Sequence, residues 1–167
     1  MNFTKRLVPW QSWDEWRYVK DLLYSNNMED EKKGVSIVNA WKCRCVSIPV
    51  AVESTALYTD LLIQMTTIMT MTTIEGQQEQ YTQQLYASSM AIIRMVNGII
   101  DAQQKGAYSK SVNIIAEEIG LPRDFVDLRH GCTHSSLPSI EVLYSALQEG
   151  KQWLFEHYWL VIILFIC

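Results

Sequence analysis

The amino-acid sequence predicts an all-α protein, a single domain of about six or seven packed helices. Apolar side chains recur every three or four positions through most of the chain, as they do along one face of a helix. Only four prolines and seven glycines interrupt the 167 residues, which favours long regular elements over many short strands. The chain is 49% hydrophobic, which suffices for a buried core, and no repeat or Gly/Ser-rich linker divides it.

The N-terminal half predicts three helices. Ser12 and Glu15 form a capping-box pattern at the start of the first helix, and Ser25-Asn26-Asn27 ends it. The second helix is expected from Asp30 to Trp41. Pro49 suits the first turn of the third helix, whose end is blurred by the tract TTIMTMTTIEG, because threonine has a low helix propensity.

Residues 77–104 predict the longest and most regular helix. Its apolar stripe follows a 4-3-4-3 spacing over Leu85, Ser89, Ile92, Val96 and Ile99, widened by Ile93 and Ile100. We interpret this stripe as core or as a dimer interface. Asn97-Gly98 lies in its middle and indicates close packing, since glycine costs about 1 kcal/mol relative to alanine inside a helix.

Three further helices complete the prediction. One runs from about Ser111 to Ile119 and ends at Gly120, a residue suited to the C′ position. The next begins at Leu121-Pro122 and turns one side toward the core, namely Phe125, Leu128 and Cys132. The last begins at Pro138, has Glu141 in its first turn, and carries the apolar residues Val142, Leu143, Leu147, Trp153 and Leu154.

The net charge argues against a broad nucleic-acid-binding surface. The chain has 14 Lys and Arg against 18 Asp and Glu, a formal charge of −4. Nucleic-acid binders usually carry a basic surplus, because neutralising phosphates supplies most of the nonspecific affinity. An RNA ligand would therefore need a local basic site or a partner. The candidate phosphate contacts are scattered: Lys42, Arg44, Lys105, Lys110 and Arg123.

Cysteine usage and the chain ends predict a reduced, intracellular, non-membrane protein. The four cysteines lack the spacing of a disulfide framework. Lys5 and Arg6 are followed by Leu-Val-Pro rather than by the apolar core of a secretory leader. Residues 160–167, LVIILFIC, form an apolar run too short for a membrane span of about 20 residues. We interpret this run as a buried or artificial end.

The stretch DFVDLRHGCTH, residues 124–134, gathers an arginine and two of the three histidines in the chain, Arg129, His130 and His134. A guanidinium binds phosphate and stabilises negative charge developing on phosphorus. An imidazole can take a proton from a hydroxyl or give one to a leaving oxygen near neutral pH. Because RNA supplies its own nucleophile, the 2′-hydroxyl, an arginine and a histidine, duplicated, are enough for metal-free RNA cleavage.

Helix geometry separates the two principal residues of this cluster. Arg129 and His134 are five positions apart, about 140° around an ideal helix, so they do not converge within one chain unless the helix ends near Thr133. Pro138 favours such an ending. His134 is therefore expected at a helix end or in a short loop.

The pattern R-x4-H of Arg129 and His134 resembles the signature of HEPN-domain ribonucleases. The surrounding stretch RMVNGIIDAQQKGAYSKSVNIIAEEIGLPRDFVDLRHGCTHSSLPSIEVL, followed by WLFEHYW, is similar to the HEPN domain of the Las family of pre-ribosomal-RNA processing endonucleases. LVPWQSWDEW and VNAWKCRCVSIPVAVESTA resemble the N-terminal part of that family. We therefore assign residues 1–159 to a HEPN nuclease domain and residues 160–167 to an atypical apolar C-terminal end.

The resemblance implies a HEPN-type helical bundle that acts as a homodimer, with the Arg-x4-His segments of two protomers facing each other. It implies cleavage of pre-ribosomal RNA in the second internal transcribed spacer, leaving 2′,3′-cyclic phosphate and 5′-hydroxyl ends without a metal or cofactor. Arg129 and His134 match the motif. His130 matches a family preference for histidine after the arginine and receives a supporting catalytic role.

The resemblance also implies a cellular setting. Members of the family are nuclear, mostly nucleolar, and assemble with a polynucleotide 5′-kinase that phosphorylates the 5′-hydroxyl left by the cut. They engage the kinase through a longer C-terminal part that this sequence lacks. The expected partners are a second copy of the chain, the kinase and pre-ribosomal RNA.

Other readings of the same residues remain. Arg129 alone would be read as a surface ion pair with Asp124 or Asp127, and His134 as a C-terminal helix cap. A metal site of His130, Cys132 and His134 is disfavoured, because on a helix Cys132 lies about 160° from each histidine. A non-catalytic helical assembly module is the alternative function, and the acidic net charge suits it.

Overall fold

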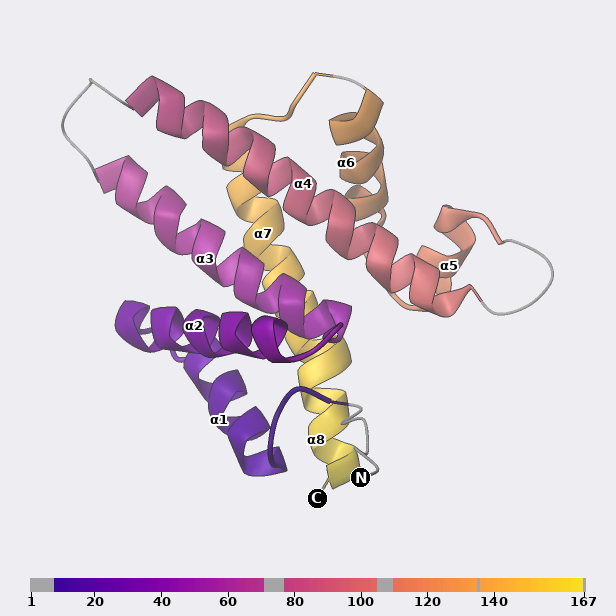
Figure 1. The fold of residues 1–167 in the computed structure, drawn as a ribbon. Coiled ribbons are helices and arrows are strands. Elements are labelled where there is room, and N and C mark those ends of the chain that lie inside the picture. The colour runs from indigo at the N-terminus through magenta and orange to yellow at the C-terminus, as the bar shows by residue number, and fades with distance from the viewer. Residues whose placement is uncertain (1–7, 71–76, 105–109, 135, 167) are drawn as a thin grey trace.

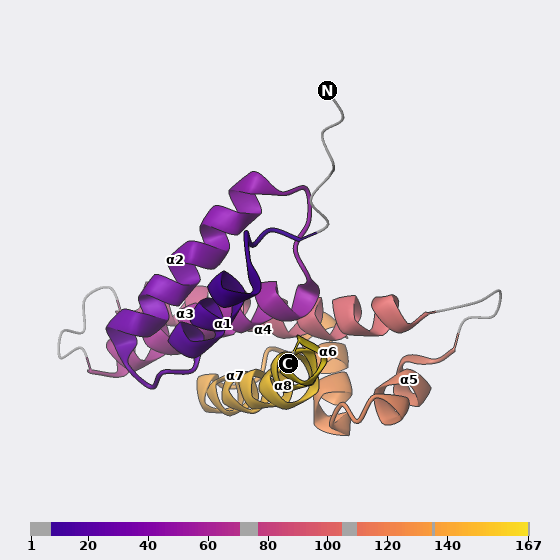
Figure 2. The same ribbon diagram turned by 90° about the horizontal axis from the view of Figure 1, so that it is seen from below.

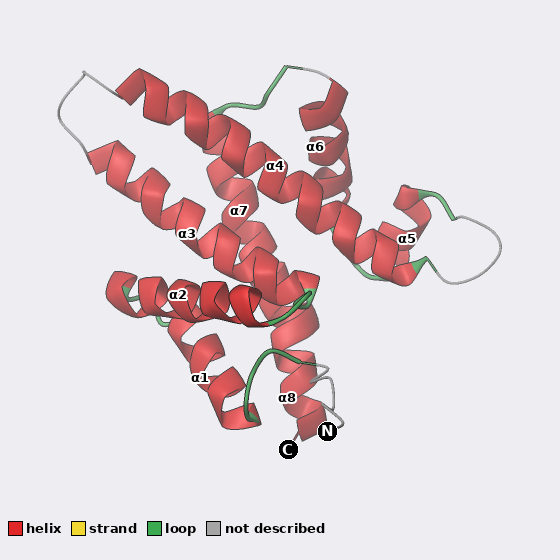
Figure 3. Cartoon of the chain, in the orientation of Figure 1, coloured by secondary structure: helices red, strands yellow, loops and turns green. Residues whose placement is uncertain are grey.

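The computed structural model describes residues 8–70, 77–104, 110–134 and 136–166. Every regular element in this described part is a helix (Figure 3), which confirms the predicted all-α class. In chain order the elements are α1 (Trp13–Leu23), α2 (Met28–Arg44), α3 (Val50–Thr70), α4 (Gln77–Gln103), α5 (Val112–Glu118), α6 (Arg123–His134), α7 (Ile140–Leu154), the π-helical segment η1 (Phe155–Trp159) and α8 (Leu160–Ile166).

The long helices α3 and α4 form an antiparallel pair at the centre of the fold (Figure 1). Both contact α7, and α4 also contacts α6 along the side away from α3. Seen from below, α6 and α7 lie on one side of this pair and α2 lies on the other (Figure 2). This arrangement places α6, which carries the Arg129 segment, directly against α4.

Two hydrophobic clusters hold the bundle together. The first contains residues of all five helices from α3 through α7. Ile92, Val96 and Ile100 of the predicted stripe on α4 are buried in it. The second joins α1, α2 and the C-terminal segment around four buried tryptophans, Trp10, Trp16, Trp41 and Trp159. The rings of Trp16 and Trp159 have centroids 4.7 Å apart, so the chain's N-terminal and C-terminal elements share this second cluster.

The first two helices begin at side-chain caps. Ser12 Oγ accepts a hydrogen bond from the Glu15 amide at 3.1 Å, as the capping-box pattern predicts. The Glu15 carboxylate reaches back to the amide of Gln11. α2 starts at Met28, two residues earlier than predicted, because Asn27 Oδ1 accepts from the amides of Glu29 and Asp30 and makes Asn27 the cap.

The threonine-rich tract does not end α3 where its propensity suggests. The helix continues to Thr70, and within it the hydroxyls of Thr66, Thr67 and Thr70 donate to carbonyl oxygens one turn earlier, at 2.8–2.9 Å. These bonds satisfy the hydroxyls locally and leave the helical backbone intact. The rest of the tract, residues 71–76, lies outside the described part of the chain.

The C-terminal helix contains a π-helical segment that the apolar pattern did not predict. η1 connects α7 to α8 without a break, and within it Trp159 is fully buried and donates from its indole nitrogen to Thr55 Oγ1 at 3.0 Å. The predicted buried end is only half buried: Ile162 and Ile163 pack against the second cluster, whereas Leu164 and Phe165 are exposed. Among the described residues, no helix combines the length and apolar character needed to cross a bilayer.

Candidate functional site

The orientation of α6 is set at its N-terminal end. Gly120 has φ of +67°, the left-handed conformation predicted for a C′ residue of the preceding helix. Its carbonyl oxygen accepts a hydrogen bond from the Trp153 indole nitrogen at 2.8 Å, which ties this turn to α7. Phe125 and Val126 are buried, and Leu128 and Cys132 pack against the core as predicted. Arg129 lies beside this buried face, against α4, whereas His130 and His134 are exposed.

Arg129 is half-buried between α6 and α4. Its Nε donates a hydrogen bond to Oδ1 of Asn97, on α4, at 2.9 Å. Asp124 and Asp127 do not pair with Arg129 in the described residues, and Asp127 is instead 3.9 Å from Arg123. The interpretation of Arg129 as a surface ion pair with these aspartates therefore has no support in the structure.

The two histidines of the cluster are exposed and lie together one helical turn apart. Their ring centroids are 4.8 Å apart with an interplanar angle of 49°. His134 is the last residue of α6, which confirms its predicted place at a helix end. No hydrogen bond joins either imidazole to Arg129 within the described residues. The structure thus brings the histidines together and holds the arginine separately against α4.

Arg129 differs electrostatically from nearly every other cation in the described part of the chain. Nine of the eleven lysines and arginines there have a carboxylate oxygen within 4.0 Å. The exceptions are Lys33, which lies over the ring of Tyr18, and Arg129. Surface ion pairs of this kind contribute little stability, but they neutralise the charge that a phosphate would meet.

The predicted phosphate contacts illustrate this pairing. Each of the four that the structure describes has a carboxylate partner, and Lys105 lies outside the described residues. The four pairs are Lys42–Glu53 at 2.7 Å, Arg44–Glu15 at 3.6 Å, Lys110–Glu118 at 2.5 Å and Arg123–Asp127 at 3.9 Å. They do not add up to a basic surface around Arg129.

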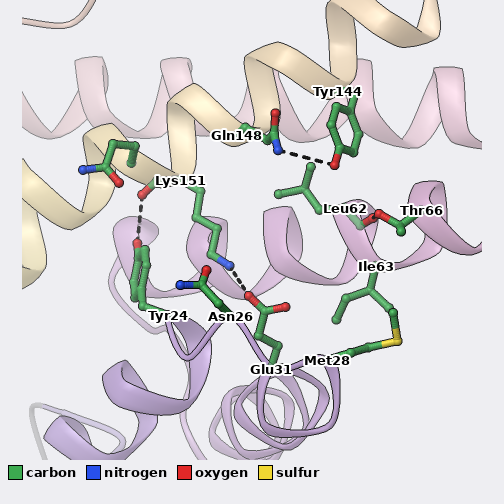
Figure 4. Close-up of a pocket in the computed structure, with 11 residues that line it drawn as sticks. Tyr24, Asn26, Met28, Glu31, Leu62, Ile63, Thr66, Tyr144, Gln148 and Lys151 are labelled. Carbon is green, nitrogen blue, oxygen red and sulfur yellow. Dashed lines mark hydrogen bonds and ion pairs between the residues drawn. The ribbon is translucent and has the colours of Figure 1, made fainter.

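Two of the hollows in the described surface do not suit a phosphate backbone. A groove of about 470 Å³ between α6 and α7 has an apolar floor and a rim of Asp124, Asp127 and Glu149, which repels anions. A pocket of about 380 Å³ lies among α2, α3 and α7 (Figure 4), but its Lys151 is paired with Glu31 at 2.7 Å. The uncompensated positive charge of the site is therefore at Arg129.

The described residues contain no set of ligands for the alternative metal site. No three His, Cys, Asp or Glu side chains gather there in a way that would hold an ion. Cys132 turns toward the core, away from the exposed histidines. His157 lies on η1, stacked on Trp153 with ring centroids 4.5 Å apart and with Nδ1 3.0 Å from the Trp153 carbonyl oxygen.

Comparisons with known proteins show which family this sequence resembles. The model of the family described as "Las1-like" matches residues 8–161. "Pre-rRNA-processing protein las1" of Schizosaccharomyces pombe is 33% identical over 160 residues, 92% of this chain and 31% of the relative. "Protein LAS1" of Saccharomyces cerevisiae is 32% identical over 160 residues, with the same coverage. "Ribosomal biogenesis protein LAS1L" of Mus musculus is 29% identical over 154 residues, which are 92% of this chain and 19% of the relative.

The chain belongs to the Las1-like family, as the resemblance of its motifs predicted. The names of the fission yeast and mouse relatives connect those proteins with pre-rRNA processing and ribosomal biogenesis. The chain spans about a third of the length of the two yeast relatives.

Asn97 was missed as a member of the site. Its signal in the sequence was an amide among the apolar residues between Ile92 and Ile100, which the Asn-Gly pair led us to interpret as close packing alone. The contact with Arg129 joins residues 32 positions apart, so helix periodicity could not reveal it.

Proposed function

We propose that this chain is the nuclease domain of an endoribonuclease that cleaves pre-ribosomal RNA in the second internal transcribed spacer during maturation of the large ribosomal subunit. The observation that carries the proposal is Arg129, a half-buried guanidinium without a carboxylate partner among the described residues, on the same helix as two exposed imidazoles. The pre-ribosomal-RNA processing role named for the fission yeast relative supplies the substrate class.

In this mechanism the RNA provides the nucleophile. His134, assisted by His130, acts as general base or acid: one imidazole takes the proton of the 2′-hydroxyl, and one gives a proton to the departing 5′-oxygen. The bond between the 2′-oxygen and phosphorus forms while the bond to the 5′-oxygen breaks. Arg129 stabilises the charge that builds on the nonbridging phosphate oxygens. The products carry a 2′,3′-cyclic phosphate and a 5′-hydroxyl, and no metal-activated water is required.

The active unit in this proposal is a homodimer of HEPN-type domains. On one chain, Arg129 points to α4 and the histidines lie on the exposed side of α6. Two α6 segments facing each other would let the arginine of one protomer act beside the histidines of the other. The complex also includes a polynucleotide 5′-kinase and works in the nucleus, mostly in the nucleolus. A partner with basic surface would compensate for the net charge of −4.

Cleavage assays with mapped product ends test the proposal. Spacer RNA is incubated with the purified chain, alone and with the kinase, using the wild type, Arg129→Ala and His134→Ala. Arg123→Ala is the matched control, because Arg123 is an exposed arginine on the same helix. We expect Arg129→Ala and His134→Ala to abolish cleavage with the dimer intact, Arg123→Ala to cut normally, and EDTA to have no effect. Activity that is lost in EDTA and restored by zinc would overturn the mechanism.

A non-catalytic assembly module is the second candidate, favoured by the carboxylate pairing of most described cations. In that case the same face of α6 would organise the kinase and other factors without cutting RNA. A folded, dimeric chain that leaves spacer RNA intact both alone and with the kinase would favour the scaffold over the nuclease.

A further inference from the structure

The hydrogen bond between Arg129 and Asn97 occupies one specific part of the guanidinium. Nε–H donates to the amide oxygen of Asn97 at 2.9 Å, which leaves the four N–H groups on the two Nη atoms. These four donors form the outer end of the planar fork, which matches two oxygens of a phosphate. A guanidinium anchored through Nε is therefore held in place, and its Nη groups make no hydrogen bond to any of the described residues.

The chemical nature of the anchor distinguishes this contact from the ion pairs elsewhere on the chain. Arg17, Arg44 and Arg123 each lie beside a carboxylate, which holds the guanidinium but also cancels its charge. A carboxylate at position 97 would hold Arg129 at least as firmly, because charge-assisted hydrogen bonds are the stronger kind. The neutral amide instead fixes the position and leaves the full positive charge available.

The backbone that carries Asn97 is itself closely fixed. The next residue, Gly98, lies so near Val50 that an added Cβ would come 2.8 and 2.9 Å from the two Val50 methyl groups. α4 is thus locked against the first turn of α3 beside the anchor. Arg129 in turn lies on α6, which packs along α4. Both partners of the hydrogen bond are held by rigid elements.

We propose that Asn97 is a positioning residue for Arg129: its uncharged amide oxygen orients the guanidinium toward a phosphate without neutralising it. The proposal rests on the proposed nuclease function for the identity of the phosphate, which is the scissile linkage of RNA. The side chain at position 97 must therefore be uncharged and must also accept a hydrogen bond.

Asn97→Asp separates this role from a merely structural one. The aspartate has the same size and accepts the same bond, so we expect the thermal unfolding midpoint to stay at or above that of the wild type. The value of kcat/KM on spacer RNA, measured with the kinase present, should fall at least about tenfold, because the charge on Arg129 is compensated. Asn97→Leu removes the acceptor and should also lower kcat/KM. Asn39→Asp, on an exposed position of α2, makes the same change in net charge and should cleave like the wild type.

The outcomes of the assay separate the positioning role from the nuclease function. Wild-type cleavage with an equally active Asn97→Asp variant overturns the positioning role and leaves the nuclease function standing. If the wild type does not cleave, the nuclease function fails, and titration with inorganic phosphate decides the positioning role. Phosphate-induced shifts of the Arg129 side-chain NMR signals in the wild type that vanish in Asn97→Asp support it. Equal shifts in both proteins, or none in either, overturn it.

Discussion

Gly98 on α4 lies against Val50, the first residue of α3, with no room for a methyl group: a Cβ on the glycine would meet the Val50 Cγ1 atom at 2.8 Å and Cγ2 at 2.9 Å. Contacts this short force either side chain or backbone to move. Val50 is β-branched and rotates little about χ1, so the helices themselves must separate. This contact sets the distance between the two central helices beside Asn97.

We therefore expect Gly98→Ala to lower the free energy of unfolding by about 1–2 kcal/mol, since overpacking outweighs the gain in helix propensity. Gly131→Ala is the matched control, because a Cβ there meets nothing within 4 Å and should raise stability by about 0.5–1 kcal/mol. Urea denaturation measures both. Combining Gly98→Ala with Val50→Ala should remove the collision. Equal stability of Gly98→Ala and Gly131→Ala would contradict the packing argument.

The two histidines of α6 are expected to differ in importance although they lie side by side. His134→Ala should reduce kcat by about 10²–10⁴-fold, the usual contribution of general acid–base catalysis, which leaves no detectable product in the end-mapping assay, and His130→Ala should reduce kcat less. Both residues are exposed, so neither change should alter the unfolding midpoint. Single-turnover cleavage of spacer RNA makes the comparison, and a larger defect in His130→Ala would reverse the assigned roles.

The hydrogen-bonded carboxylate of Glu15 predicts that the stability of the fold depends on pH. Burial alone would raise the pKa of Glu15, but hydrogen bonds from the Gln11 amide and the Trp41 indole, together with Arg44, outweigh it and leave the pKa lowered. A lowered folded-state pKa means that the carboxylate stabilises the fold at neutral pH, and that this contribution is lost as the pH falls through the folded-state pKa.

Glu15→Gln should accordingly be less stable than the wild type at pH 7, and the difference should shrink toward about pH 3, below the usual pKa of a glutamate. Urea unfolding at several pH values measures the difference. Glu117→Gln, an exposed glutamate on α5, should show no comparable trend. A stability gap that is constant across this range would exclude the proposed contribution of the Glu15 charge.

The helices were predictable because their signals are local. The Ser12–Glu15 cap, Gly120 and the apolar stripe of α4 each depend on neighbours within a few turns, and the structure confirms all three. One start was wrong: Asn27 caps α2, so this helix begins at Met28 rather than at the predicted Asp30. The sequence left the end of α3 open, and the structure places it at Thr70.

The candidate site was only partly predictable for the opposite reason. The spacing of Arg129 and His134 correctly indicated that they lie on different sides of one helix. What Arg129 contacts depends on how α6 is rotated against α4, and this rotation follows from tertiary packing of Phe125 and Val126. The π-helical segment η1, within which Trp159 is buried and bonds to Thr55, likewise has no pattern of its own in the sequence.

An ion pair between Glu31 and Lys151 joins α2 to α7 (Figure 4). Its nitrogen–oxygen distance is 2.7 Å, and the two side chains are only 16% and 14% exposed. Removing one partner leaves a poorly solvated charge, so Glu31→Met or Lys151→Met should each lower the free energy of unfolding by about 1–3 kcal/mol, somewhat below the cost for a fully buried pair. The double variant should recover most of this loss, because no unpaired charge remains and the methionines fill the space. A double-mutant cycle by urea denaturation measures the coupling, and strictly additive losses would show that the pair contributes no interaction energy. RNA cleavage should be unaffected in all three variants, because Lys151 lies near the C-terminal end of α7, whereas the turn from α6 leads into its N-terminal end.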